Sequence, residues 1–160
     1  MFTQIVFFGL DAMRLYASSG DTVVISILDK AEASQRPVFN QYKDVLELEF
    51  EDTYEEMKLA QPGAWPGNPT EAEHTRFAQR KGEKVPTLVD AKLIVDFLTK
   101  YQCSPDSFNL VIHCHQGASR SAAVATWAAT RLFVPLGTSR STAWANPRLL
   151  RLLDEASGWY

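Results

Sequence analysis

The feature that most constrains this chain is the stretch VIHCHQGASRSAAVA at residues 111–125. It begins with apolar, β-branched residues typical of a buried strand, passes through a polar turn containing Gly117, and ends in an alanine-rich run typical of a helix. A strand that runs into a helix through such a turn is the local unit of α/β folds, and the junction lies at the carboxyl edge of the sheet. The stretch therefore predicts a sheet covered by helices.

Strand and helix signals alternate along the rest of the chain. QIVFFG and TVVISIL predict strands by their β-branched and aromatic content, and the alternation in KDVLELEF predicts a half-buried strand. Helices are expected in DAMRLYASSG, capped by Gly20, and in the amphipathic segments that start near Pro86 and Asn146. Together these elements predict a single α/β domain over residues 1–160, with a layered, mostly parallel sheet flanked by helices.

One long segment, residues 53–85, interrupts this alternation. It loses periodicity and collects proline and glycine, with a helical turn expected only in TEAEHTRFAQR. Loops of this length are usually functional or mobile, and we predict that the part around Trp65 forms a lid or pocket wall. In the amphipathic helix that follows, Asp90 and Asp96 are expected to be solvated.

Composition excludes several classes of function. The net charge of −3 gives no general basis for nucleic-acid binding. No stretch approaches the ~18 apolar residues of a membrane helix, and the N-terminus reads as a strand rather than a signal peptide. Two cysteines, Cys103 and Cys114, make no disulfide framework, which predicts a cytoplasmic protein. The oligomeric state stays open.

The turn after the strand has the properties of an anion site. Its backbone N–H groups and the N-terminus of the following helix favour an anion, and the same surroundings favour a thiolate at Cys114. Arg120 can offer a planar fork to two oxygens of a phosphate, and Ser121 can donate to the sulfur. The residues predicted to bind the phosphate are His115, Gln116, Gly117, Ala118, Ser119 and Arg120.

These residues also carry a family resemblance. His113, Cys114, Gly117, Arg120 and Ser121 match the His-Cys-x-x-Gly-x-x-Arg-Ser signature of the cysteine-based protein tyrosine phosphatases. The short chain and the SRSAA continuation resemble the compact dual-specificity branch. TVVISILDKAE, VLELEFED, VDAKLIVDFL and TAWANPRLLRLLDE resemble segments of small bacterial and phage-type predicted tyrosine phosphatases, in the same order.

The resemblance implies a tyrosine phosphatase-like fold and a two-step reaction. Cys114 would attack a phosphomonoester to give a cysteinyl-phosphate, which water then hydrolyses, with Arg120 stabilising the transferring group and Ser121 assisting. His113 would order the loop by hydrogen bonding. No metal or other cofactor is implied. The expected partner is a phosphorylated protein or peptide, carrying phosphotyrosine and also, as an open alternative, phosphoserine or phosphothreonine.

The proton donor is less closely specified. Asp52 follows an earlier strand, as the acid does in compact phosphatases, and is the predicted donor. Larger members carry the acid in a Trp-Pro-Asp loop, but GAWPGNP has Gly67 at that position, which leaves Glu71 and Glu73 as alternatives. If the acid is displaced, the alternative function is a catalytically weak phosphate-binding module.

Other residues have simpler interpretations. His115 is interpreted as a variable loop residue and His74 as a surface residue. For Cys103 a packing or surface role is favoured over a redox partnership with Cys114. Tyr54, Trp65 and Trp144 could flank a phosphoaryl group, although aromatic side chains more often pack in a core.

Overall fold

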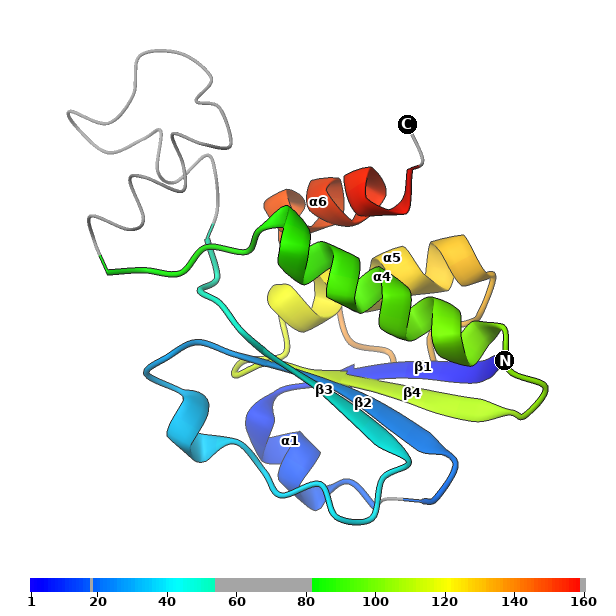
Figure 1. Ribbon diagram of the computed structural model, residues 1–160. Helices are drawn as coiled ribbons and strands as arrows, with labels where there is room; N and C mark the ends of the chain where they lie inside the picture. The colour runs from blue at the N-terminus through cyan, green and yellow to red at the C-terminus, as the bar shows by residue number, and fades with distance from the viewer. Residues whose placement is uncertain (18, 54–81, 159–160) are drawn as a thin grey trace.

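The computed structural model describes residues 1–17, 19–53 and 82–158. Within them, four strands form one sheet that carries helices on both faces (Figure 1). Each neighbouring pair of these strands is parallel. The prediction of an α/β architecture with a mostly parallel sheet is therefore confirmed. The predicted helical turn in TEAEHTRFAQR and the predicted pocket wall around Trp65 lie outside the described residues.

The sheet places its most apolar strands in the centre. The strands are β1 (Phe2–Phe8), β2 (Thr22–Leu28), β3 (Asp44–Glu49) and β4 (Phe108–His113), in the order β1-β4-β2-β3. β2 and β4 have helices on both sides, which explains why β2 is buried along its whole length and β4 along nearly all of it. β3 lies at an edge and alternates partly buried apolar residues with exposed glutamates, as its sequence predicts. The strand that leads to Cys114 thus occupies the middle of the sheet.

Helices of unequal size cover the two faces. α4 (Leu88–Gln102), α5 (Arg120–Leu132) and α6 (Pro147–Ser157) pack on one face, while α1 (Leu10–Leu15) and the 3-10 helix η1 (Ala33–Gln35) lie on the other (Figure 1). The larger hydrophobic core lies under α4, α5 and α6, and a smaller one lies under α1. No helix in the described part of the chain has the length and apolar character needed to cross a membrane.

Helix α1 is shorter than its sequence predicts. A helix through DAMRLYASSG with Gly20 as its cap is wrong at the C-terminal end, because Tyr16 already has an extended backbone. The Tyr16 ring packs on Phe8 in this extended conformation, with ring centroids 5.2 Å apart. The serine-rich remainder competes for local hydrogen bonds and favours turns. Gly20 lies instead in the turn before β2.

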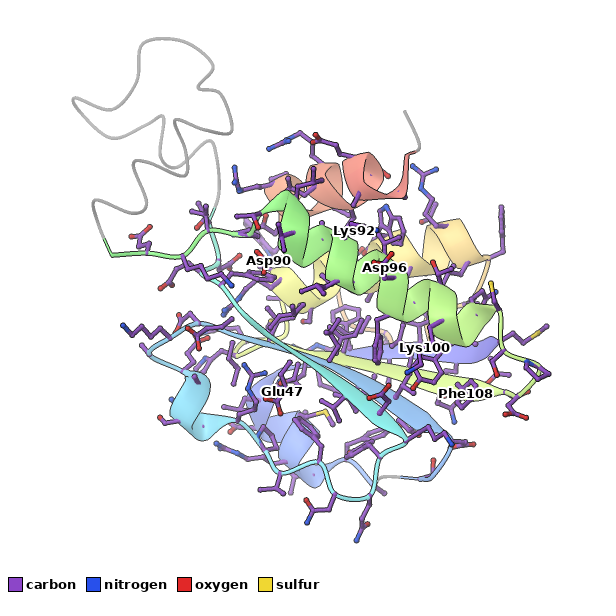
Figure 2. The ribbon with its side chains drawn as sticks, in the orientation of Figure 1. Glu47, Asp90, Lys92, Asp96, Lys100 and Phe108 are labelled. Atoms are coloured by element: carbon purple, nitrogen blue, oxygen red, sulfur yellow. The ribbon has the colours of Figure 1, made fainter. Side chains whose placement is uncertain are left out.

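Of the two aspartates in α4 that were predicted to be solvated, one is buried. Asp90 is not solvated, since it is only 4% exposed. Its carboxylate accepts hydrogen bonds from the backbone N–H and the hydroxyl of Thr87, each 2.9 Å long, and Lys84 Nζ lies 3.4 Å away. Asp90 therefore caps the start of α4. Asp96 is exposed as predicted and pairs with Lys92 at 3.1 Å further along the same helix (Figure 2).

Candidate active site

The loop between β4 and α5 lies against the end of β1. Gly117 has a φ of +69°, and a Cβ at this position would lie 2.2 Å from Gly9 N. Gly9 is constrained in turn, because its own Cβ would lie 2.9 Å from Gln116 O. The backbone N–H of Leu10 donates to His115 O at 2.9 Å. These contacts fix the loop at the carboxyl edge of the sheet and explain why glycine is needed at residue 117.

Cys114 lies at the centre of this loop. The residue is 2% exposed. Its Sγ accepts a hydrogen bond from the Gly117 N–H at 3.2 Å and lies 3.1 Å from Ser121 Oγ. Ser121 is fully buried in the first turn of α5. A sulfur that faces two donors near a helix N-terminus is in surroundings that favour negative charge.

Arg120 is the buried cation of the site. Its Nη1 donates to Phe50 O at 3.1 Å, and its Nη2 lies 3.1 Å and 3.3 Å from the two carboxylate oxygens of Glu32. Its Nε is buried and has no hydrogen-bond partner among the described residues. A buried N–H without a partner is costly, so an anion that accepted from Arg120 Nε would satisfy a vacant donor.

Asp52 lies beside the loop, and one of its carboxylate oxygens is held by hydrogen bonds. Its Oδ1 accepts hydrogen bonds from Ser119 Oγ at 2.6 Å and from Asn146 Nδ2 at 2.8 Å. Asn146 is fully buried, caps α6 through Leu149 N, and donates its backbone N–H to Ser119 O. The other oxygen, Oδ2, accepts no hydrogen bond from the residues that the structure describes. Asn146 therefore ties the aspartate to the start of α5.

Most of the predicted site residues line one cavity. Its volume is about 370 Å³. Within the described ranges, the backbone N–H groups of His115, Gln116 and Ala118 donate to no acceptor of the chain. Unpaired N–H groups at the start of a helix, next to a buried guanidinium, make a site for a tetrahedral anion. The lining residues are Asp52, Cys114, Gln116, Ala118, Ser119, Arg120 and Trp144.

His113 lies behind the loop rather than in the cavity. Burial, followed by the charges of Arg36 and Arg120, lowers the pKa of His113 to about 4, so the ring is neutral at pH 7. Its Nδ1 lies 3.3 Å from Cys114 O and its Nε2 lies 2.6 Å from Ser26 Oγ. Because a neutral ring carries one proton, Nδ1–H donates to the carbonyl and Nε2 accepts from the serine. Arg36 in turn donates to Ser26 Oγ at 2.6 Å.

Glu51 is a second carboxyl next to Asp52. Burial, followed by the nearby charge and hydrogen bond of Asp29, raises the pKa of Glu51 to about 7, and Arg120 opposes this increase. Glu51 does not line the cavity that contains Cys114. Glu51 is therefore close enough to Arg120 for their charges to interact, although it is not part of the cavity lining.

Sequence reasoning did not identify three residues that contact the site. Glu32 pairs with Arg120, Asn146 holds Asp52, and Arg140 donates to the carbonyls of the loop. Glu32 and Arg140 lie outside the signature in segments without periodicity, and Asn146 lies at the start of the predicted amphipathic helix. The preference of asparagine for helix N-caps was the one available signal, and it concerns Asn146 only.

The remaining predicted residues fall outside the cavity or outside the described residues. His115 is partly exposed, with Nδ1 4.0 Å from Glu32 Oε1. Cys103 is an exposed free thiol at the end of α4, and Cys114 is a separate buried one. The alternative acids and aromatic residues of the long segment, namely Tyr54, Trp65, Glu71, Glu73 and His74, lie outside the described residues.

A scan against protein-family models finds no match, and comparisons with curated proteins and with solved structures find none. In the part of the chain that the structure describes, no group of three or more His, Cys, Asp or Glu side chains could hold a metal ion. The interpretation of the site therefore depends on its geometry and on the sequence signature.

Proposed function

We propose that this chain is a protein phosphatase that hydrolyses phosphotyrosine through a cysteinyl-phosphate intermediate, on a tyrosine phosphatase-like fold. The observation that carries the proposal is that a nucleophilic side chain and a buried N–H donor belong to residues that line the same cavity. Cys114 and Arg120 line the same cavity, and the buried Nε of Arg120 has no partner among the described residues. The signature residues around them add the resemblance to cysteine-based phosphatases.

In the first step, the Cys114 thiolate attacks the phosphorus of the bound ester. The S–P bond forms as the P–O bond to the leaving group breaks. Arg120 and the loop N–H groups hold the equatorial oxygens while charge moves across the phosphoryl group. Oδ2 of Asp52 is the oxygen that would carry the proton to the leaving oxygen, because Oδ1 is already occupied by Ser119 and Asn146.

In the second step, water attacks the phosphorus of the cysteinyl-phosphate. The Asp52 carboxylate takes the proton from the water, and the S–P bond breaks to release phosphate and the thiolate. The hydroxyl of Ser121, 3.1 Å from Sγ, is close enough to donate a hydrogen bond to the leaving sulfur. The enzyme returns to its starting state with atoms and charge balanced.

The wall of the cavity favours an aromatic ester. Trp144 lines the cavity beside Cys114, and the residue is 70% exposed, so its ring could stack on a phosphoaryl group. HQGAS, between Cys114 and Arg120, has no lysine, whereas phosphoinositide phosphatases of this superfamily carry lysines there. A phosphotyrosine-containing protein is therefore the proposed substrate, with phosphoserine and phosphothreonine as the open alternative. A nucleophilic thiol must stay reduced, which agrees with the cytoplasmic location predicted from the sequence.

The test is phosphate release from a phosphotyrosine peptide without added metal. We expect Cys114→Ser to abolish turnover, and Asp52→Asn to reduce kcat by about 10² to 10³ because the donor is lost. Cys103→Ser and Asp96→Asn are matched controls, since both residues are exposed and outside the cavity. Turnover that persists in Cys114→Ser would sink the proposal.

A second function, a phosphate-binding module with little turnover, is favoured by one observation. Arg120 already bonds to Glu32 and Phe50, and Asp52 already bonds to Ser119 and Asn146. A site held in this way could bind a phosphopeptide without completing catalysis. A wild-type protein that binds phosphotyrosine peptides and releases no phosphate from phosphotyrosine or phosphoserine peptides would establish this function instead.

A further inference from the structure

Arg140 approaches the loop from its outer side. Its Nε donates to Gly117 O at 3.3 Å, and its Nη2 donates to Gln116 O at 3.2 Å and to Gly117 O at 3.1 Å. Arg140 lines one hollow together with His115, Cys114 lines another, and Gln116 borders both. One guanidinium thus binds two consecutive carbonyls behind the candidate site.

The geometry of the peptide bond transmits this contact across the loop. All peptide bonds in the described residues are trans, so the C=O and N–H of each peptide group point in opposite directions. The carbonyl of Gln116 shares its peptide group with the N–H of Gly117, and the carbonyl of Gly117 shares its own with the N–H of Ala118. When both carbonyls point to Arg140, both N–H groups point away from it. The Gly117 N–H does so, since it donates to Cys114 Sγ at 3.2 Å.

We propose that Arg140 is a positioning residue for the phosphate loop, orienting the N–H groups of Gly117 and Ala118 toward the Cys114 sulfur and a bound phosphate. For the phosphate, the inference rests on the proposed function. The positive charge behind the carbonyls also polarises the two peptide groups, which makes their N–H groups stronger donors to an anion. Donors that are oriented before the anion arrives need no reorganisation when it binds.

The planar fork of arginine suits this task. Two donor nitrogens in one rigid plane reach two neighbouring carbonyls, whereas a lysine ammonium is a point charge on a flexible stem. Arg140→Lys should therefore retain the charge but fix the two peptide groups less well. Arg140→Gln should lose both the charge and the fork.

The test measures the thiol directly, in a Cys103→Ser background that removes the exposed second thiol. The readouts are the rate of Cys114 alkylation by iodoacetamide as a function of pH, and the protection against alkylation by inorganic phosphate. Arg151→Gln is the matched control, because Arg151 lies on α6 beside Glu155 and does not line either hollow. A thermal unfolding curve of each variant verifies that it is folded.

We expect Arg140→Gln to move the midpoint of the alkylation profile up by about one pH unit and to weaken phosphate protection about tenfold. Arg140→Lys should fall between wild type and Arg140→Gln, and it serves as the test if the glutamine variant does not fold. Profiles and phosphate protection that match those of Arg151→Gln would overturn the inference.

The two proposals can fail separately. Alkylation needs no substrate, so a wild type that hydrolyses no phosphomonoester but shows the expected shift in Arg140→Gln contradicts the proposed function and supports the positioning role. If the wild type is an active phosphatase and Arg140→Gln changes neither readout, the proposed function is supported and the positioning role is contradicted.

Discussion

The charged pairs at the two ends of the parallel strands differ in their exposure to water. We call the end where the strands begin the amino edge and the end where they finish the carboxyl edge. At the amino edge, Asp44 Oδ2 accepts from Lys100 Nζ at 2.8 Å and from Tyr101 Oη at 2.5 Å, and the Lys100 side chain is 62% exposed. At the carboxyl edge, Arg120 and Glu32 form a pair whose side chains are 5% and 18% exposed. Water can replace a lost partner at the first edge and has little access at the second. A substitution that removes one partner of a charged pair should therefore cost more stability at the carboxyl edge than at the amino edge.

The largest effect is expected from a substitution of Gly117 at the carboxyl edge, and Gly20 near the amino edge is its comparison. Gly117→Ala places a Cβ 2.2 Å from Gly9 N at a φ of +69°, so the backbone must move. We expect it to lower the free energy of unfolding by about 4 kcal/mol and to abolish phosphate binding. Gly20→Ala, in open space near the amino edge, should change it by less than about 0.5 kcal/mol. Urea denaturation measures both, and equal effects would contradict the close contact at the loop.

The second prediction concerns pH and His113. Its pKa of about 4 lies below the ordinary value of 6.5, so between these values the unfolded chain binds more protons than the folded protein. Stability from this residue is therefore complete above pH 6.5 and is lost as the pH falls to 4. Integration over this range gives about 3 kcal/mol. Chemical denaturation at pH 7 and pH 4.5 should show that, on acidification, the free energy of unfolding of wild type changes unfavourably relative to that of His113→Asn by most of this amount.

Glu51 titrates in the same range with the opposite sign. Its raised pKa of about 7 means that the folded protein holds this proton more tightly, so its contribution is present at low pH and lost as the pH rises through 7. The prediction for His113 is therefore the difference between wild type and variant, in which Glu51 cancels. A pH dependence that is the same in both proteins would show that His113 is not the buried neutral group described above.

The third prediction removes one carboxylate at each edge and compares the losses in stability. Glu32→Gln removes the carboxylate beside the buried Arg120, and we expect the free energy of unfolding to fall by about 2 kcal/mol. Asp44→Asn removes the carboxylate of the more exposed pair with Lys100, and we expect a loss below about 1 kcal/mol. Urea denaturation at pH 7 compares them. A larger loss for Asp44→Asn would reverse the comparison between the edges.

The smallest effect is expected at Trp144. Removing its ring in Trp144→Ala should reduce kcat/KM for a phosphotyrosine peptide about tenfold and leave that for a phosphoserine peptide unchanged. Phe133, 94% exposed just after the end of α5, is the matched aromatic control away from the cavity. Equal losses on both peptides would assign Trp144 to the shape of the cavity rather than to recognition of an aromatic ring.

Local sequence signals predicted the fold well and the site in part. The strand-turn-helix pattern around Cys114 predicted the position of the loop because each element there depends on residues close in sequence. Asp52 was predicted at the end of its strand, and the structure places it in the cavity wall. The prediction for the end of α1 is wrong, because the backbone is already extended at Tyr16, whose ring packs on Phe8.

Contacts between distant segments could not be predicted in this way. Arg140 and Glu32 reach the loop and Arg120 from segments that are far away in sequence. Solvation of Asp90 was predicted from its helical position, but a cap hydrogen bond buried it. For Arg140 and Glu32 no local pattern records the partnership, whereas the Thr-x-x-Asp spacing of Thr87 and Asp90 is a local capping signal that the helical interpretation overlooked.

The strand order also determines when the site can form. β4 is the last strand in the chain, yet it lies between β1 and β2 and is paired to both. Among the strands of the described residues, β1 pairs only with β4, and without β4 the remaining strand pair is β2 with β3. Contacts between such distant parts of the chain form slowly, because a long loop must close first. We therefore expect the step that completes the sheet to be the step that brings Cys114 into position, so that partly folded chains contain no preformed phosphate loop.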